Sequence, residues 1–124
     1  MGDAAHFESL VTTAYDALPD RFREASAGLS IRVEPTASEH ILTTLDLQDP
    51  FELLGLYHGI NLTQKSVLDV QSAPNEVLLY REPIIAYAER EGLKLSEVVY
   101  HVLVHEIGHH FGFSDEDMER LQQS

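Results

Sequence analysis

The sequence predicts an α+β fold in which a small sheet packs against one buried helix near the C-terminal end. Two observations indicate this arrangement. Helical and strand patterns mix over the first two thirds of the chain, and only helical patterns follow residue 83, an order typical of α+β domains. Residues 98–104, VVYHVLV, carry no formal charge while His101 is neutral, so a helix through them is apolar nearly all round and is expected to be buried.

The N-terminal part is expected to contain two helices and a strand. Apolar residues recur at helical spacing over residues 4–18, with Asp3 as a candidate N-cap. Pro19 ends this helix and suits the start of a second over residues 19–27. Residues 29–34 alternate between apolar and polar, which predicts a strand with one exposed face.

The middle of the chain is expected to add a short helix and two strands. Ser38 is a candidate N-cap for a short amphipathic helix. Residues 51–57 and 77–80 are apolar runs of strand length between turn-forming residues. Residues 60–76 show no strong periodicity and are expected to form an irregular connection.

Three helical segments are expected in the C-terminal part. The first covers residues 83–91 and ends at Gly92. Ser96 is the candidate N-cap of the buried helix, residues 96–110. Residues 115–122 are expected to form a last helical piece.

Residues 105–109, HEIGH, form an H-E-x-x-H motif within the buried helix. His105 and His109 are one helical turn apart, so their imidazoles lie on one face and can converge on one cation. Zinc accepts such nitrogens at about 2.0–2.1 Å and keeps an open position for water when the site is catalytic. Glu106 can reach that water without binding the metal, which is the general-base position of the motif.

A third protein ligand is needed, because two histidines do not hold a catalytic zinc. Gly112 suits the left-handed conformation that commonly ends a helix. A turn there would bring Asp115 to the metal first. Three other acidic residues compete but need a longer excursion or a second helix: Glu116, Asp117 and Glu119.

The histidines and the glutamate of the motif could also be ordinary polar residues. Helical His and Glu are often solvated surface groups, but burying a carboxylate and two imidazoles without partners would cost several kcal/mol, which a metal would offset. His101 and His110 flank the motif. They are either supporting groups around the metal or ordinary core and surface histidines.

The chain resembles a family of short bacterial zincin-like metallopeptidases with the signature His-Glu-x-x-His-x-x-Gly-x-x-Asp. The likeness extends to ALPDRFREA, DPFELLGLYHGINLTQKS and EVLLYREPI. The resemblance implies a minimal, metzincin-like zincin fold with zinc as cofactor. It places His105, His109 and Asp115 at the ligand positions and Glu106 at the catalytic position, and it names no substrate.

The resemblance also implies a place for the substrate. In zincins the substrate lies antiparallel along an exposed edge strand above the metal. By analogy this edge is residues 53–57. Tyr57, His58 and Tyr80 would then stand near the cleft and polarise a carbonyl or hold a tetrahedral intermediate, or the tyrosines would simply pack at the margin of the core.

The composition limits the number of domains, the kinds of partner and the cellular compartment that we expect. A chain of 124 residues without cysteine is expected to be one domain, residues 1–124, without disulfides or thiolate metal ligands. Its net charge of −13 disfavours nucleic acid and membranes as partners. The charge either favours a basic peptide or protein or only maintains solubility. With no signal-peptide pattern at the N-terminus, we expect a cytoplasmic protein.

These observations predict a zinc-dependent peptide-bond hydrolase acting on a peptide or protein. The alternative is a zincin-like binding or regulatory module whose metal is structural or which does not catalyse. Hydrolysis of a non-peptide amide is a third candidate. Glu106 favours an enzyme, because a structural metal site needs no base.

Overall fold

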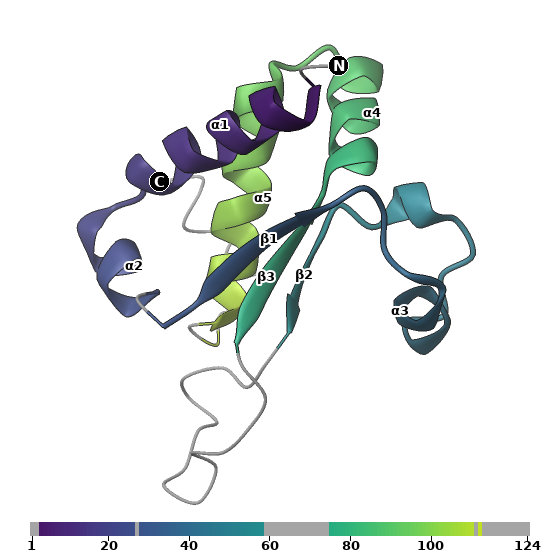
Figure 1. Ribbon diagram of the computed structural model, residues 1–124, viewed down its shortest axis with the longest axis horizontal. Coiled ribbons are helices and arrows are strands. Elements are labelled where there is room, and N and C mark those ends of the chain that lie inside the picture. Colours follow the sequence, from purple (N-terminus) through teal and green to yellow (C-terminus); the bar gives the residue numbers. More distant parts are fainter. Residues whose placement is uncertain (1–2, 27, 59–74, 111, 113–124) are drawn as a thin grey trace, which may run out of the picture.

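The computed structural model describes residues 3–26, 28–58, 75–110 and 112. In this part of the chain a three-stranded mixed sheet is accompanied by five α-helices and a short 3-10 helix (Figure 1). The strands are β1 (Ser30–Glu34), β2 (Gly55–His58) and β3 (Glu76–Tyr80). β3 lies in the centre, parallel to β1 and antiparallel to β2. The predicted α+β class is confirmed.

Helix α5 (Leu95–His110) forms the centre of the core. It contacts β2 and β3 as well as α1 (Asp3–Asp16) and α4 (Arg81–Glu91) (Figure 1). The residues that meet there are apolar and fully buried, among them Val77, Leu79, Val99, Leu103 and Ile107. The helix that carries the motif is therefore buried along one side only; its apolar run predicted burial nearly all round, but His101 is exposed and Tyr100 is half-buried. None of the helices in the described part of the chain has the length and hydropathy of a transmembrane segment.

The other face of the sheet carries a smaller apolar cluster. Leu78 and Tyr80 alternate with the inward residues of β3 and pack with Ala37 on this face. Ile41 and Leu42 of α3 (Glu39–Thr44) lie against them. Strand β3 is thus covered on both faces, which fits its nearly continuous apolar sequence.

Several predicted elements are confirmed to within two residues. Helix α1, α2 (Asp20–Ala25) and strand β1 lie where the periodicity placed them. Ser38 caps α3, since its Oγ accepts a hydrogen bond of 3.2 Å from the amide of Ile41. Gly92 ends α4 with φ of 67°, the left-handed conformation that glycine adopts without steric cost.

The strand predicted over residues 51–57 is wrong in its first half. Residues Pro50–Glu52 form the 3-10 helix η1, and β2 begins at Gly55. The carboxylate of Asp49 accepts a hydrogen bond of 2.9 Å from the amide of Phe51, and proline supplies a helical φ at the first position. The side-chain cap and the proline therefore favour a helical turn here, although the apolar run favours a strand.

Two predicted helix starts are corrected. Helix α4 begins at Arg81, directly after β3 and two residues earlier than expected. Helix α5 begins at Leu95, so Ser96 lies inside its first turn and is not the N-cap. The carbonyl of Lys94 accepts the amides of Glu97 and Val98 at 3.1 and 3.2 Å. The helix predicted over residues 115–122 and nearly all of the connection over 60–76 lie outside the described residues.

Candidate functional site

Helix α5 presents His105 and His109 side by side. Their ring centroids are 4.9 Å apart with an interplanar angle of 78°. Both histidines are half-buried, whereas Ile107 between them is fully buried and turned into the core. The two imidazoles therefore share the more accessible side of the helix, which is the arrangement that one cation between them requires.

The chain turns after the motif as the sequence suggested. Gly112 has φ of 88°, and its amide donates a hydrogen bond of 2.9 Å to the carbonyl of His109. Asp115, the expected third ligand, lies outside the described residues, as do its competitors Glu116, Asp117 and Glu119. Among the described residues, no group of three or more His, Asp or Glu side chains could hold a metal ion.

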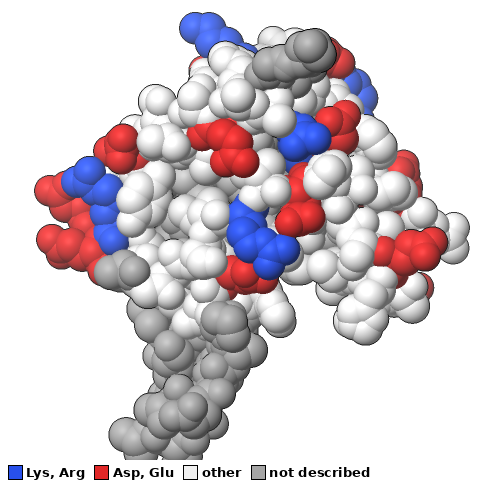
Figure 2. Space-filling view, viewed as in Figure 1, with Lys and Arg blue, Asp and Glu red and all other residues white. Residues whose placement is uncertain are grey.

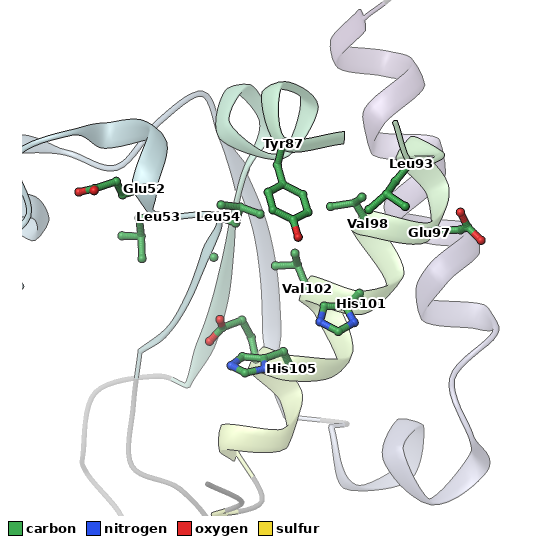
Figure 3. A pocket seen from close by; sticks show the side chains of 12 residues that line it. Glu52, Leu53, Leu54, Tyr87, Leu93, Glu97, Val98, His101, Val102 and His105 are labelled. Carbon is green, nitrogen blue, oxygen red and sulfur yellow. The ribbon is translucent and has the colours of Figure 1, made fainter. Parts of the chain in front are cut away.

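A cavity of about 660 Å³ opens beside the motif (Figure 3). One wall is the segment 52–55 before and at the start of β2, and the other is the face of α5 that carries His105 and Glu106. Tyr87 of α4 closes it between them. Its volume lies within the range of pockets that bind small ligands, about 300–1,000 Å³. The predicted catalytic glutamate thus faces a space that a substrate can enter.

Gly55 allows the edge strand to approach Glu106 closely. A Cβ on Gly55 would lie 2.8 Å from Cγ1 of Val102 and 3.2 Å from Cγ of Glu106. Any larger residue would push β2 away from α5 or displace the Glu106 side chain. The role of Gly55 was not predicted from the sequence, although a glycine at a strand position is itself a signal of close backbone approach.

Strand β2 is an edge of the sheet, because within the described part of the chain it pairs with β3 alone. Tyr57 lies near the motif. Its hydroxyl is 2.9 Å from Nδ1 of His110, and burial raises the pKa of Tyr57. The predicted edge strand is therefore next to the motif helix.

None of the three residues expected near the cleft, Tyr57, His58 and Tyr80, lines the cavity. His58 is exposed, with Nδ1 3.9 Å from the Glu76 carboxylate. Tyr80 is 1% exposed in the cluster on the opposite face of the sheet. Burial, followed by the charge of Glu34, raises the pKa of Tyr80 to about 12. The tyrosines instead pack with the core, which is the alternative that the sequence left open; Tyr80 does so on the face opposite α5, because side chains alternate along β3.

The two flanking histidines differ in environment. His101 is exposed and lines the cavity one helical turn before His105. His110 is only 3% exposed and contacts Tyr57. Tyr87, which also lines the cavity, carried no signal in the sequence, because its position depends on how α4 packs against α5.

The description of one family model, zincin-like metallopeptidase, fits this arrangement, and the model matches residues 26–124. The chain belongs to the zincin-like metallopeptidase family. The match includes the whole sheet, helices α3 to α5 and the motif. This confirms the resemblance seen in the sequence, and the α+β structure of this zincin-like metallopeptidase is consistent with a minimal zincin fold. None of the curated proteins compared with the chain matches it.

Proposed function

We propose that this chain is a zinc-dependent peptidase. In this proposal His105, His109 and Asp115 hold the zinc ion, and Glu106 is the catalytic base. The observation that carries the proposal is the pair of imidazoles 4.9 Å apart on α5, with Glu106 of the same turn lining a cavity. Membership of the zincin-like metallopeptidase family supports it.

The residues suit zinc by their chemistry. Two imidazole nitrogens and a carboxylate oxygen form a donor set found in catalytic zinc sites, which combine three protein ligands with an open position. Gly112 has φ of 88°, so the chain leaves the helical conformation three residues after His109. When bound, zinc would supply positive charge that polarises a scissile carbonyl and makes a water molecule more acidic.

Glu106 moves the proton in this proposal. Its carboxylate accepts a proton from the attacking water and then donates it to the leaving amine. A Cβ on Gly55 would lie only 3.2 Å from Cγ of Glu106, so the nearby backbone of β2 restricts where the carboxylate can lie. Glu106 also lines the cavity, so the proposed base lies beside the space for the substrate.

The substrate is proposed to be a peptide or protein. The side of β2 that pairs with no described strand is proposed to offer main-chain groups to an extended chain. Acidic side chains are spread over the face shown in Figure 2, with basic ones among them. A net charge of −13 favours basic substrates in the approach to the site.

Peptide-library digestion tests the proposal. The wild type, Glu106→Gln and the control Glu89→Gln are compared at matched zinc content; Glu89 is exposed on α4. We expect cleavage by the wild type and the control, and a loss of about 10²–10⁴-fold in Glu106→Gln, the size of a general acid–base contribution. Equal cleavage by Glu106→Gln would refute the mechanism. If none cleaves and all capture one cellular partner, the chain is a binding module.

A further inference from the structure

The inner part of the cavity is lined by apolar side chains from two helices and the edge segment. Tyr87 extends from α4 toward Val102 of α5, with Leu54 and Val98 on either side (Figure 3). The Tyr87 ring is half-buried and has the Arg90 guanidinium 5.3 Å from its centroid. The Tyr87 ring therefore narrows the cavity opposite Val102.

Charged groups lie at the margin of this space and not inside it. Glu52 and Glu97 both contribute to the cavity wall and are exposed. Their carboxylates point away from the space between Tyr87 and Val102 (Figure 3). Among the described lining residues, His101, His105 and Glu106 of α5 are the other ones that offer charged or metal-binding groups to a ligand. A charged ligand group buried between Tyr87 and Val102 would lose hydration without meeting an opposite charge on the apolar lining residues there, Leu54, Val98 and Val102.

Exposed apolar side chains continue the lining to the surface. Leu93, which lines the cavity, is 47% exposed, and Phe51, next to the lining residue Glu52, is 46% exposed. Large exposed apolar groups that adjoin an apolar cavity mark a binding surface more often than isolated ones do. The surface and the cavity together fit an apolar group that enters from solvent.

The length of the cavity fits a side chain beside the reaction centre. Val98 and His105 both line it and are separated by roughly 10 Å along the helix axis, at 1.5 Å per residue. A peptide with its scissile bond at His105 and Glu106 therefore has a neighbouring side chain within reach of the Tyr87 end.

We propose that this cavity receives one large apolar side chain of the substrate next to the scissile bond, and that Tyr87 is the specificity-determining residue at its inner end. The inference rests on the proposed function, because that function places the scissile bond at Glu106. Leucine and phenylalanine side chains are the expected occupants, since they fill the cavity without burying a charge.

Cleavage of a peptide series tests the role of Tyr87. The peptides differ in one residue beside the scissile bond: Ala, Asp, Leu, Phe or Trp. We expect Leu and Phe to exceed Ala in kcat/KM by about tenfold or more, the size of discrimination that an apolar pocket provides. Tyr87→Ala deepens the cavity and is expected to raise the Trp-to-Leu ratio of kcat/KM by about tenfold.

Tyr100→Ala is the matched control, because Tyr100 is also a half-buried tyrosine in contact with the core but does not line the cavity. It should leave the Trp-to-Leu ratio unchanged. Cleavage without a preference for large apolar residues would overturn the inference while leaving the proposed function standing. An unchanged Trp-to-Leu ratio of kcat/KM in Tyr87→Ala would also overturn the inference and leave the proposed function standing.

A binding measurement separates the two proposals. The protein as purified is titrated with N-acetyl-phenylalaninamide or N-acetyl-alaninamide while backbone amide shifts are recorded. We expect saturable shifts at Gly55, Val98 and Val102 with the phenylalanine probe alone. Such shifts without cleavage of any peptide would support the apolar site and refute the peptidase. Shifts that follow protein concentration and not the probe would show a second copy in the cavity and overturn the inference.

Discussion

The hydroxyl of Tyr57 lies 2.9 Å from Nδ1 of His110, and this hydrogen bond joins the edge strand β2 to the last turn of α5. The rings also meet edge to face, with centroids 5.5 Å apart. His110 is 3% exposed and follows His109 directly. The contact therefore fixes the end of the motif helix against the strand proposed to bind substrate.

Removing this hydrogen bond should weaken the fold measurably. We expect Tyr57→Phe to lower the free energy of unfolding by about 0.5–1.5 kcal/mol, the usual net contribution of one hydrogen bond. Urea denaturation measures this difference. The control is Tyr100→Phe, since the Tyr100 hydroxyl makes no hydrogen bond within the described residues. Equal losses in both variants would show that the Tyr57–His110 bond does not stabilise the protein.

Gly55 should tolerate no side chain. Its Cβ would lie 2.8 Å from Cγ1 of Val102 and 3.2 Å from the carbonyl oxygen of Leu78, so Gly55→Ala forces β2 or α5 to move. We expect a loss of about 1–3 kcal/mol in stability, typical of overpacking, and a fall in peptide cleavage because Glu106 is displaced. Thermal unfolding and cleavage assays measure the two effects.

Gly28→Ala is the control for this variant. A Cβ on Gly28 meets nothing within 4 Å, and Gly28 is not among the positive-φ residues of the described chain. This change should leave stability and cleavage close to those of the wild type. If Gly55→Ala behaves like Gly28→Ala, the close approach of β2 to α5 is not required.

The sequence predicted those features that depend on neighbours in the chain. The motif helix follows from an apolar run with histidines at i and i+4, and β3 from a short apolar run. Helix η1 was missed because Asp49 caps it through its side chain at 2.9 Å, and a hydropathy pattern does not detect such a local hydrogen bond. A prediction that also used the preference of aspartate for the N-cap and of proline for the first helical position would have favoured a helical turn over a strand here.

Features made by distant segments were not predictable. Gly55 meets Val102 and Glu106 only after β2 has packed on α5. Tyr87 lines the cavity because β3 leads directly into α4, which places this helix beside α5. Periodicity shows that a residue is on an apolar face but not which partner it meets. The residues that form the wall of the cavity could therefore be identified only from the tertiary structure.

Stability at high pH should depend on Tyr80. Its pKa is raised from 10.0 to about 12, first by burial and then by the charge of Glu34. Because the unfolded chain ionises at the lower pH, stability does not depend on this ionisation below pH 10 and falls as the pH rises from 10 toward 12. Two pKa units correspond to about 2–3 kcal/mol.

Tyr80→Phe checks this pH dependence by urea unfolding from pH 8 to 11.5. Above pH 10 the variant should lose less stability than the wild type. A smaller loss of stability should remain, because the pKa of Tyr57 is also raised. At pH 8 it should be more stable by about 1 kcal/mol, because the buried Tyr80 hydroxyl has no hydrogen-bond partner among the described residues. If the free energy of unfolding depends on pH in the same way in both proteins, Tyr80 is not the source of the pH dependence.

Zinc binding should depend on His105 and His109 and not on His101. The first two rings lie edge to face with their centroids 4.9 Å apart, whereas His101 lies one turn earlier and is exposed. We expect one zinc ion per wild-type chain by elemental analysis, and much less after His105→Ala or His109→Ala. His101→Ala should retain zinc. Undiminished zinc in either motif variant would remove the basis of the proposed metal site.

The third ligand should be Asp115, which follows the turn at Gly112. Asp115→Ala removes a direct ligand in this proposal, whereas Glu119→Ala removes at most a supporting group. Loss of a supporting group typically lowers metal affinity by about 10–100-fold, so we expect Asp115→Ala to lower the zinc affinity by more than that. Competition with a chromophoric chelator measures both affinities. If Glu119→Ala lowers the zinc affinity more than Asp115→Ala does, the third ligand is one of the later carboxylates and not Asp115.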